Sequence, residues 1–241
     1  MTDFQLSQDR EAYLTGQVLL LDKPYGWSSF QALNALKWTL RKAFDLKKIK
    51  VGHAGTLDPL ATGLLLLCTG KSTSQIQSLQ GMKKEYTGTI HLGATTASYD
   101  LETKPGPQKA VDHLDLSSIQ QAIRELTGEI MQRPPVFSAL KKDGKRMYEY
   151  ARSGQEVEVP QRLVFIESFE VHNLTLPQID FKVTCSKGTY IRSLAHDLGQ
   201  ILGVGAHLSA LRRTKIGEFS VDNAVSPEAF REYFRSSGFP V

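Results

Sequence analysis

The sequence predicts an α+β protein with a mixed, largely antiparallel central sheet that is flanked by helices. Stretches in which apolar and polar residues alternate, as in strands, are interspersed with stretches of three- and four-residue apolar spacing, as in helices. The two kinds of stretch do not alternate regularly, as they would in a doubly wound parallel sheet. Two strand-like stretches, 163–174 and 179–185, follow each other directly across Pro177.

Composition is that of an ordinary globular protein. The chain has 241 residues, of which 41% are hydrophobic and 22% charged, so it can bury a sizeable core and extended disorder is not expected. The net charge of +4 is weak evidence for a polyanionic partner. Cys68 and Cys185 stand alone in apolar surroundings and are expected to be reduced and buried. The polar N-terminus does not resemble a signal peptide and no apolar run could span a bilayer, which predicts a cytoplasmic protein.

The N-terminal part begins with a predicted strand at 16–22, which the sequence Lys23-Pro24-Tyr25-Gly26 interrupts. Ser28 or Ser29 can cap the helix that follows. Its predicted buried face consists of five apolar residues at helical spacing: Phe30, Leu33, Leu36, Leu40 and Phe44. The lysines and arginines of its other face and tail are explained by solvation, with contact to phosphates as the alternative.

Segment 51–70 (VGHAGTLDPLATGLLLLCTG) is different in kind, because four glycines and a proline surround a single acid and no lysine or arginine is present. Glycines at this density indicate sharp turns or a close approach of the backbone to another group. The elements predicted after it are a short helix at 73–80, a strand at 85–93, a loop at 94–112 and a helix at 116–127 that Gly128 ends.

The C-terminal part restarts in extended form at 133–135, and 136–140 with the turn at 142–145 is predicted to form a hairpin tip. The remaining predicted elements are a short helix at 147–153, strands at 163–174 and 179–185, a helix at 189–202, a strand region at 208–219 and a short helix at 227–234.

Asp58 is the first candidate for chemistry. By local rules an acid before a proline caps a helix. A carboxylate in an apolar, glycine-rich loop must also find a distant cation or bear the cost of desolvation, and Arg192, at the start of a predicted helix, is such a cation. An Asp58–Arg192 pair would keep the carboxylate ionised and held in place, which suits a nucleophile and equally a structural salt bridge. Phosphate-binding loops, nucleotide-binding fingerprints, zinc motifs and serine-nucleophile elbows are missing from the sequence.

The segment 133–152 (RPPVFSALKKDGKRMYEYAR) places six cations against two acids and interleaves them with Phe137, Tyr148 and Tyr150. Cations that follow a phosphate backbone and rings that stack on bases make up RNA-binding surfaces. A solvated hairpin whose rings face the core explains the composition equally well. The smaller basic cluster at 211–215 leaves the same two interpretations open.

Several motifs together resemble one family. VGHAGTLDPLATGLL is similar to the catalytic motif of the TruB family, which makes pseudouridine 55 in the T loop of tRNA, and its Thr-Leu-Asp form differs from the Arg-Leu-Asp of sister synthases. LLLDKPYGWSSF resembles the family motif KPxGxTS, from which Trp27 and Ser28 depart slightly. The segments KKEYTGTIHLGATTASYD, RPPVFSALKKDGKRMYEYARSG, CSKGTYIRSLAHDLG and AHLSALRRTKIGEF complete the set in the expected order.

The resemblance implies a pseudouridine synthase fold and a role for each matching position. Asp58 matches the catalytic aspartate, Arg192 the arginine that pairs with it, and Tyr86 the tyrosine that stacks on the target uracil. The other matches are Tyr190 in the active site, Leu211 lining the pocket, His53 at the flipped-out bases, and Lys23 and Pro24 supporting the site. Without the resemblance, Tyr86 and Leu211 would be taken for core residues and His53 for a loop histidine.

The resemblance further implies a cofactor-free and metal-free isomerase that acts as a monomer on the T arm of tRNA. The expected organisation is an N-terminal extension at 1–16, a catalytic domain at 17–225 and a short tail at 226–241, without the PUA-type domain that many members carry. Two alternatives remain: a non-catalytic RNA-binding protein with the same fold, and a carboxylate-dependent hydrolase of small glycosides or nucleosides.

Overall fold

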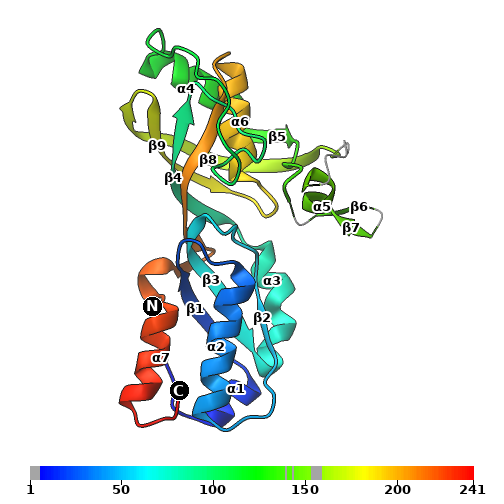
Figure 1. Ribbon diagram of the computed structural model, residues 1–241, viewed down its shortest axis with the longest axis vertical. Coiled ribbons are helices and arrows are strands. Elements are labelled where there is room, and N and C mark those ends of the chain that lie inside the picture. The colour runs from blue at the N-terminus through cyan, green and yellow to red at the C-terminus, as the bar shows by residue number, and fades with distance from the viewer. Residues whose placement is uncertain (1–5, 139, 143, 153–158) are drawn as a thin grey trace. The chain divides into compact units, whose positions relative to one another are not determined.

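The computed structural model of the protein describes residues 6–138, 140–142, 144–152 and 159–241 (Figure 1). The chain forms two compact units, of which the first comprises 1–85 and 212–241 and the second 86–211. The predicted α+β class with a largely antiparallel sheet and flanking helices is confirmed, since six of the strand pairs are antiparallel. Within the described ranges, no helix combines the length and apolar character that a bilayer crossing needs.

Among its described residues, the first unit contains four α-helices, two short 3-10 helices and four strands of its own. These elements are α1 (Arg10–Thr15), β1 (Val18–Lys23), α2 (Ser29–Ala43), β2 (Val51–His53), β3 (Ala61–Thr69), η1 (Gly70–Gln75), α3 (Ile76–Gly81), β11 (Phe219–Ser220), η2 (Val221–Asn223) and α7 (Pro227–Ser236). Strand β4 (Lys84–Leu92) begins in this unit, and β10 (Ala206–Ile216) ends in it. Strand β3 pairs with β1 along its length and with β2 at its C-terminal end.

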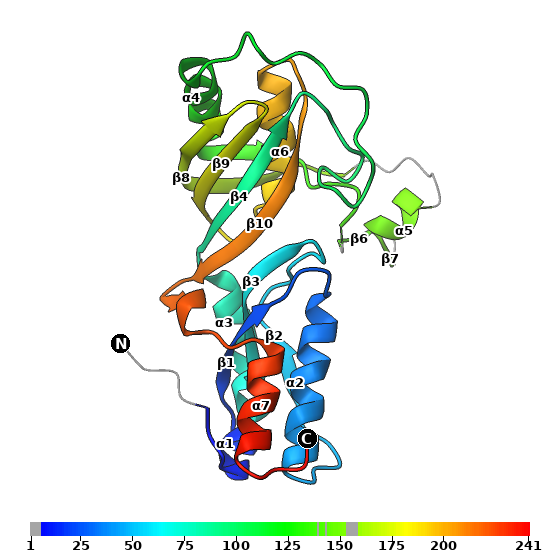
Figure 2. The ribbon, with the colours of Figure 1, turned by 60° about the vertical axis from the view of Figure 1, so that its left-hand side comes forward.

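Alternation along β1 and β3 separates two cores in the first unit. One face contributes Leu19, Leu21, Leu65 and Leu67 to a cluster with α2 and α7, which lie side by side in both views (Figure 1 and Figure 2). The opposite face contributes Leu20, Leu64, Leu66 and Cys68 to a second cluster, together with Leu79 of α3 and Ile216 of β10. Both faces of β3 are therefore covered, which explains its continuous apolar run.

The main sheet of the second unit has five strands in the order β10-β4-β9-β8-β5, and β6 and β7 form a separate two-stranded sheet (Figure 2). The elements of this unit are α4 (Leu116–Glu125), β5 (Gly128–Gln132), β6 (Lys141–Lys142), β7 (Lys145–Arg146), α5 (Met147–Arg152), β8 (Arg162–Thr175), β9 (Gln178–Cys185) and α6 (Ile191–Ile201). Buried and half-exposed residues alternate along β9, so one face of the sheet packs on the core that α4 and α6 also cover.

Most predicted elements are present close to their expected bounds, including the strand at β1, the helix α2 with its Ser28 cap, and the β8–β9 pair. The hairpin tip is confirmed by the antiparallel pairing of β6 with β7, while Asp143 of its turn lies outside the described residues. Neither Cys68 nor Cys185 forms a disulfide, and both are buried, as expected. The division into an extension, a catalytic domain and a tail stays a prediction.

Three features differ from the expectations. Helix α1 and strands β2, β3 and β5 were not predicted, and Gly128 begins β5 rather than ending α4, whose C-cap is Leu126. Phe30 was expected on the buried face of α2 but is 66% exposed. The buried stripe passes instead through Ser29, Ala32 and Leu33. Successive residues of a helix are turned by about 100°, so Phe30 lies about 100° past Ser29 and about 60° past Leu33, outside the arc that the buried residues occupy.

Candidate active site

Asp58 lies at the start of a tight turn in the first unit. The turn leads from β2 into β3, and the Ala61 amide donates to the Asp58 carbonyl at 3.1 Å. No helix follows Asp58, so the interpretation of this acid as a helix cap is wrong. The segment returns at once into a buried strand, which leaves Asp58 half-buried at the strand end.

The residues on either side of Asp58 are held by the first residue of α2 and by the loop that precedes this helix. The Ser29 hydroxyl accepts from the Leu57 amide at 2.8 Å and donates to the Leu57 carbonyl at 2.9 Å. On the other side, the Gly26 amide donates to the Pro59 carbonyl at 2.9 Å. Ser29 is 3% exposed, so these bonds are shielded from water. The backbone that carries Asp58 is thereby fixed at both neighbouring residues.

The buried side chain of Lys23 also connects the loop after β1 with the Asp58 turn. Its side chain is fully buried, and its ammonium group donates to the carbonyls of Pro24 at 2.9 Å and Trp27 at 2.6 Å, with a longer contact to Pro59 at 3.4 Å. Burial lowers the pKa of Lys23 to about 8, the Asp58 carboxylate opposes this shift, and the charge of Arg213 adds to it. Lys23 thus joins the KPYGW loop to the Asp58 turn.

The buried side chain of Arg213 binds the backbone before and after the Asp58 turn. It is 2% exposed, and its guanidinium donates to the Leu64 carbonyl at 2.7 Å, the Gly55 carbonyl at 3.1 Å and the Thr56 carbonyl at 3.4 Å. At Gly63 (φ 102°), a Cβ atom would stand 2.3 Å from the Arg213 carbonyl, so the close approach of β3 to β10 requires glycine. One buried cation therefore holds the backbone of the segment on both sides of Asp58.

Two further residues of the predicted site lie in this unit. His53 ends β2, and burial together with the charge of Arg213 lowers the pKa of its imidazole, which favours the neutral ring. Pro24 follows Lys23 directly and contributes its carbonyl to the ammonium group. Four of the predicted residues, Asp58, His53, Lys23 and Pro24, therefore lie in the first unit.

In the second unit Arg192 is the centre of a buried network. It lies in the first turn of α6, is 3% exposed, and donates to the Ser98 and Phe137 carbonyls, each at 3.0 Å. Its Nε lies 3.7 Å from Oδ2 of Asp100, which is 5% exposed. A buried ion pair of this kind holds the guanidinium plane in one orientation. The sequence did not single out Asp100, because nothing distinguishes one acid in a polar loop.

Tyr190 immediately precedes this helix, and a buried glutamine holds its backbone. The Gln132 side chain, fully buried in β5, accepts from the Tyr190 amide at 2.8 Å and donates to the Tyr190 carbonyl at 3.0 Å. The Tyr190 ring lies 4.7 Å from the guanidinium carbon of Arg162 and 5.9 Å from that of Arg192, in cation–π range. Gln132 is a second residue that the sequence did not reveal.

The other two residues predicted in this unit lie on its strands. Tyr86 is on β4 and 8% exposed, and Leu211 is half-buried on β10. Asp58 and Arg192 belong to different units, and the pairing expected between them stays a prediction. Among the described residues, no group of three His, Cys, Asp or Glu side chains is arranged to hold a metal ion. The expectation of a cofactor-free reaction also stays a prediction.

The structure decides between the two interpretations of the basic cluster at 211–215, whereas both interpretations of the segment 133–152 stay open. Arg213 is buried under the Asp58 turn, whereas Arg212 forms a two-point ion pair with Asp22 at 3.0 and 2.7 Å. Period-two alternation could have shown that only one of these arginines faces inward. In 133–152, Phe137 and Tyr150 are half-buried, and the structure describes the backbone but not the side chain of most of the cationic residues. The RNA-surface interpretation of this segment stays a prediction.

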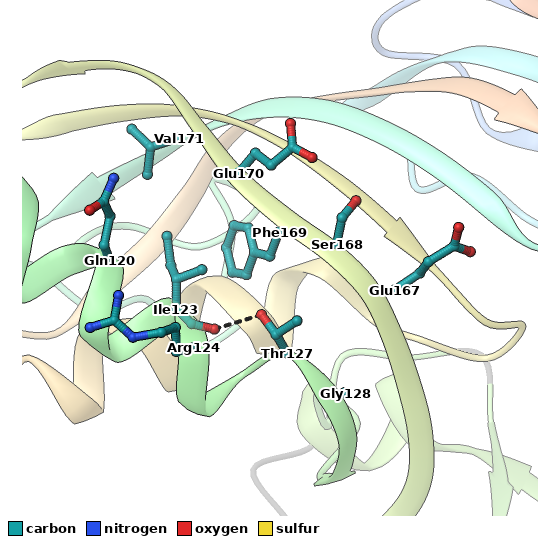
Figure 3. A pocket seen from close by; sticks show the side chains of 10 residues that line it. All are labelled: Gln120, Ile123, Arg124, Thr127, Gly128, Glu167, Ser168, Phe169, Glu170 and Val171. Carbon is teal, nitrogen blue, oxygen red and sulfur yellow. Dashed lines mark hydrogen bonds between the residues drawn. The ribbon is translucent and has the colours of Figure 1, made fainter.

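A separate groove of about 790 Å³ lies between α4 and β8 in the second unit (Figure 3). Ile123 and Phe169 supply apolar walls, while the Glu170 carboxylate points away from the helix (Figure 3). The Thr127 hydroxyl is used locally, since it donates to the Ile123 carbonyl at 2.8 Å. None of the predicted site residues lines this groove, so it takes no part in the chemistry considered below.

Comparison with known proteins places the chain among enzymes that make pseudouridine. The profile described as "TruB family pseudouridylate synthase (N terminal domain)" matches residues 41–191, and that of the "tRNA pseudouridylate synthase B C-terminal domain" matches residues 192–237. The chain belongs to the TruB family of pseudouridylate synthases.

The curated relatives have nearly the same length. "tRNA pseudouridine synthase B" of Flavobacterium johnsoniae is 56% identical over 92% of this chain and 97% of that protein. The protein of the same name from Phocaeicola vulgatus is 46% identical over 90% of this chain and 93% of its own length.

Solved structures share the fold. A chain in "Crystal Structure of a Cbf5-Nop10-Gar1 Complex" is 30% identical with a TM-score of 0.67, over 97% of this chain and 60% of that one. A chain in "Structure of H/ACA RNP bound to a substrate RNA containing 2'-deoxyuridine" is also 30% identical, with a TM-score of 0.66 over 94% of this chain and 56% of that one. The protein thus spans a little over half the length of those two structural relatives.

Proposed function

We propose that this protein isomerises uridine 55 in the T loop of tRNA to pseudouridine, with Asp58 as the nucleophile and without a cofactor. The observation that carries the proposal is the fixed turn at Asp58. The only acid of a glycine-rich segment lies between two residues whose backbones are hydrogen-bonded to a buried serine and a glycine. The curated relatives named tRNA pseudouridine synthase B support the choice of tRNA as the substrate.

The reaction rearranges bonds within one nucleotide. The Asp58 carboxylate bonds transiently to the nucleotide, at ribose C1′ or at uracil C6, the bond from uracil N1 to ribose C1′ breaks, and the base turns in the pocket. Uracil C5 then bonds to C1′, the C5 proton leaves to a base, and N1 takes up a proton, so the product is an isomer of the substrate. The bond to Asp58 breaks again as the product forms, which restores the free carboxylate. A nucleophile gains most from being held in the reacting geometry. The bonds from Ser29, Gly26 and Lys23 to the residues beside Asp58 supply that constraint.

The residues of the second unit have supporting roles in this proposal. Arg192 keeps the Asp58 carboxylate ionised, and the Asp100 ion pair sets the orientation of its guanidinium. Tyr86 stacks on the uracil, while Tyr190 and Leu211 shape the pocket around it. His53 meets the RNA where bases have left the stack, and a neutral ring suits contact with a base. Stacking on an aromatic ring offsets part of the cost of flipping the target out of its loop.

The protein is proposed to act as a monomer in the cytoplasm, where it meets tRNA. Binding to the T arm involves the phosphate backbone, for which the segment 133–152 supplies cations. Affinity should therefore fall steeply as the salt concentration rises, because each neutralised phosphate releases counterions.

Asp58→Asn provides the direct test. On an unmodified T-arm transcript, the variant should form no detectable pseudouridine, while its Kd for the transcript stays within about threefold of the wild type. Asp112→Asn, an exposed acid in a loop, is the matched control and should retain full turnover. Product formation by purified Asp58→Asn at the wild-type rate would contradict the proposal.

The same assay distinguishes the two alternative functions. A pure RNA-binding protein would bind the transcript but give no product with the wild-type chain. A hydrolase of small nucleosides would release free uracil, and neither its rate nor its binding would depend on RNA or salt.

A further inference from the structure

Two exposed aromatic rings flank the Asp58 turn. Tyr25 is 63% exposed and Phe30 is 66% exposed, which puts them among the most exposed large apolar side chains of the described chain. Single exposed rings are common on protein surfaces. Tyr25 lies in the loop before α2 and Phe30 in the first turn of α2, and this short segment holds the backbone on either side of the proposed nucleophile.

The connection from each ring to Asp58 runs through a hydrogen-bonded neighbour. Tyr25 precedes Gly26, whose amide donates to the Pro59 carbonyl at 2.9 Å. Phe30 follows Ser29, which bonds both the amide and the carbonyl of Leu57. Leu57 and Pro59 are the two neighbours of Asp58. Each ring therefore belongs to a residue that is adjacent in sequence to one hydrogen-bonded to a neighbour of Asp58.

Local packing explains why the rings face solvent. Trp27, between them in sequence, packs against the core cluster beneath α2, and Ser29 occupies the buried stripe of the helix. Phe30 is therefore turned outward in the first helical turn, and Tyr25 lies in the preceding turn, which Gly26 (φ 81°) completes. Thr56 and Pro59, close to Asp58 in sequence, are also exposed, and the Gly26–Pro59 hydrogen bond joins this exposed segment to the loop that carries Tyr25.

We infer that Tyr25 and Phe30 form a stacking surface for the unpaired bases next to the target uridine. This inference rests on the proposed function, because it takes RNA as the substrate of Asp58. A target nucleotide that leaves its stack exposes the faces of the bases on either side, and those faces need new partners. Rings are suitable partners, since every base has a π-face and stacking tolerates differences in sequence. No cation is required, so this contact adds affinity without adding to the salt dependence.

The test measures RNA binding apart from turnover, in the Asp58→Asn background. Tyr25→Ala and Phe30→Ala should each weaken binding to a T-arm transcript roughly 5- to 10-fold, a range typical of losing one stacked base. The slope of log Kd against log salt should stay unchanged. Tyr25→Phe and Phe30→Tyr keep a ring and should bind like the parent. Phe165→Ala removes a ring that is 47% exposed on β8 and serves as the matched control without effect.

A second arm identifies the bases. Transcripts with an abasic site on either side of the target should bind the parent protein more weakly. The ring and base losses should then be non-additive, because each removes the same contact. Additive losses, or an unchanged Kd in both alanine variants, would overturn the inference while leaving Asp58 turnover intact.

Failure of the proposed function has a different signature, namely tight binding without any product from the wild-type chain. Self-association is the competing explanation for exposed rings. If sedimentation shows a concentration-dependent dimer that the double alanine variant abolishes, with Kd for RNA unaffected, the surface binds a second copy of the chain and the inference is wrong.

Discussion

Replacing Arg213 should lower the stability of the protein far more than replacing the neighbouring, partly exposed Arg212, because Arg213 is buried and hydrogen-bonded to backbone carbonyls. In Arg213→Met, the carbonyls of Leu64 and Gly55 lose donors at 2.7 and 3.1 Å, and the Leu64 carbonyl lies among fully buried residues that water does not reach. An unsatisfied buried acceptor costs about 1–3 kcal/mol, and a bond from a charged donor is at the upper end of that range. We expect the free energy of unfolding to fall by about 3 kcal/mol.

The same change should impair the chemistry, because Arg213 holds the segment that carries Asp58. A displacement of the nucleophile by about 1 Å can lower the rate roughly 100-fold. Single-turnover formation of pseudouridine should therefore slow by about that factor under conditions where the variant remains folded. The His53 imidazole should also titrate at a higher pKa, because a cation that lowers its pKa has been removed.

Arg212→Met is the matched control for this experiment. Arg212 is the next residue along β10, and its side chain is 40% exposed in an ion pair with Asp22. Surface pairs contribute about 0–1 kcal/mol, so this variant should lose little stability. Urea denaturation measures both variants. Equal losses in the two, or an Arg213→Met protein as stable and as active as the wild type, would refute the reasoning.

Two further predictions concern the second unit. Gln132→Met should lower the free energy of unfolding by about 2 kcal/mol, since the Tyr190 amide loses its buried acceptor. Gln121→Met, at an exposed position, should leave it unchanged. Equal losses in the two variants would contradict a role of Gln132 in holding the Tyr190 backbone. Burial raises the pKa of the Asp197 carboxyl from 3.8 to about 6, so the stability it contributes at low pH is lost as pH rises through 6. Asp197→Asn should therefore stabilise the protein at pH 7.5 but not below pH 4, as urea titrations at both pH values can check.

Local patterns in the sequence were enough for most of the fold. Strand β1 and helix α2 could be predicted because apolar spacing, a chain break at Pro24 and a serine cap are properties of about ten consecutive residues. Strand β3 was missed, because a strand that is buried on both faces shows a continuous apolar run instead of alternation. Strand β5 was missed because Gly128 resembles a helix stop as much as a strand start.

In the candidate site, too, some residues could be identified from the sequence and others only from the folded structure. Asp58 could be singled out from the sequence, since its motif is contiguous and its surroundings carry no other charge. The burial of Arg213 and the exposure of Arg212 could not be assigned, because they depend on the register of β10 against β3, about 150 residues away in the chain. The Arg192–Asp100 pair likewise joins residues that only the folded chain brings together.

The sequence by itself thus determined the fold class, the order of most elements and the identity of the catalytic candidate, since each depends on neighbouring residues. Tertiary structure alone decided which cations are structural, which glutamine holds Tyr190, and that Tyr25 and Phe30 face solvent beside the Asp58 turn. The physical reason is that hydrogen-bond partners and exposure depend on the packing of distant segments, and local spacing carries no record of that packing.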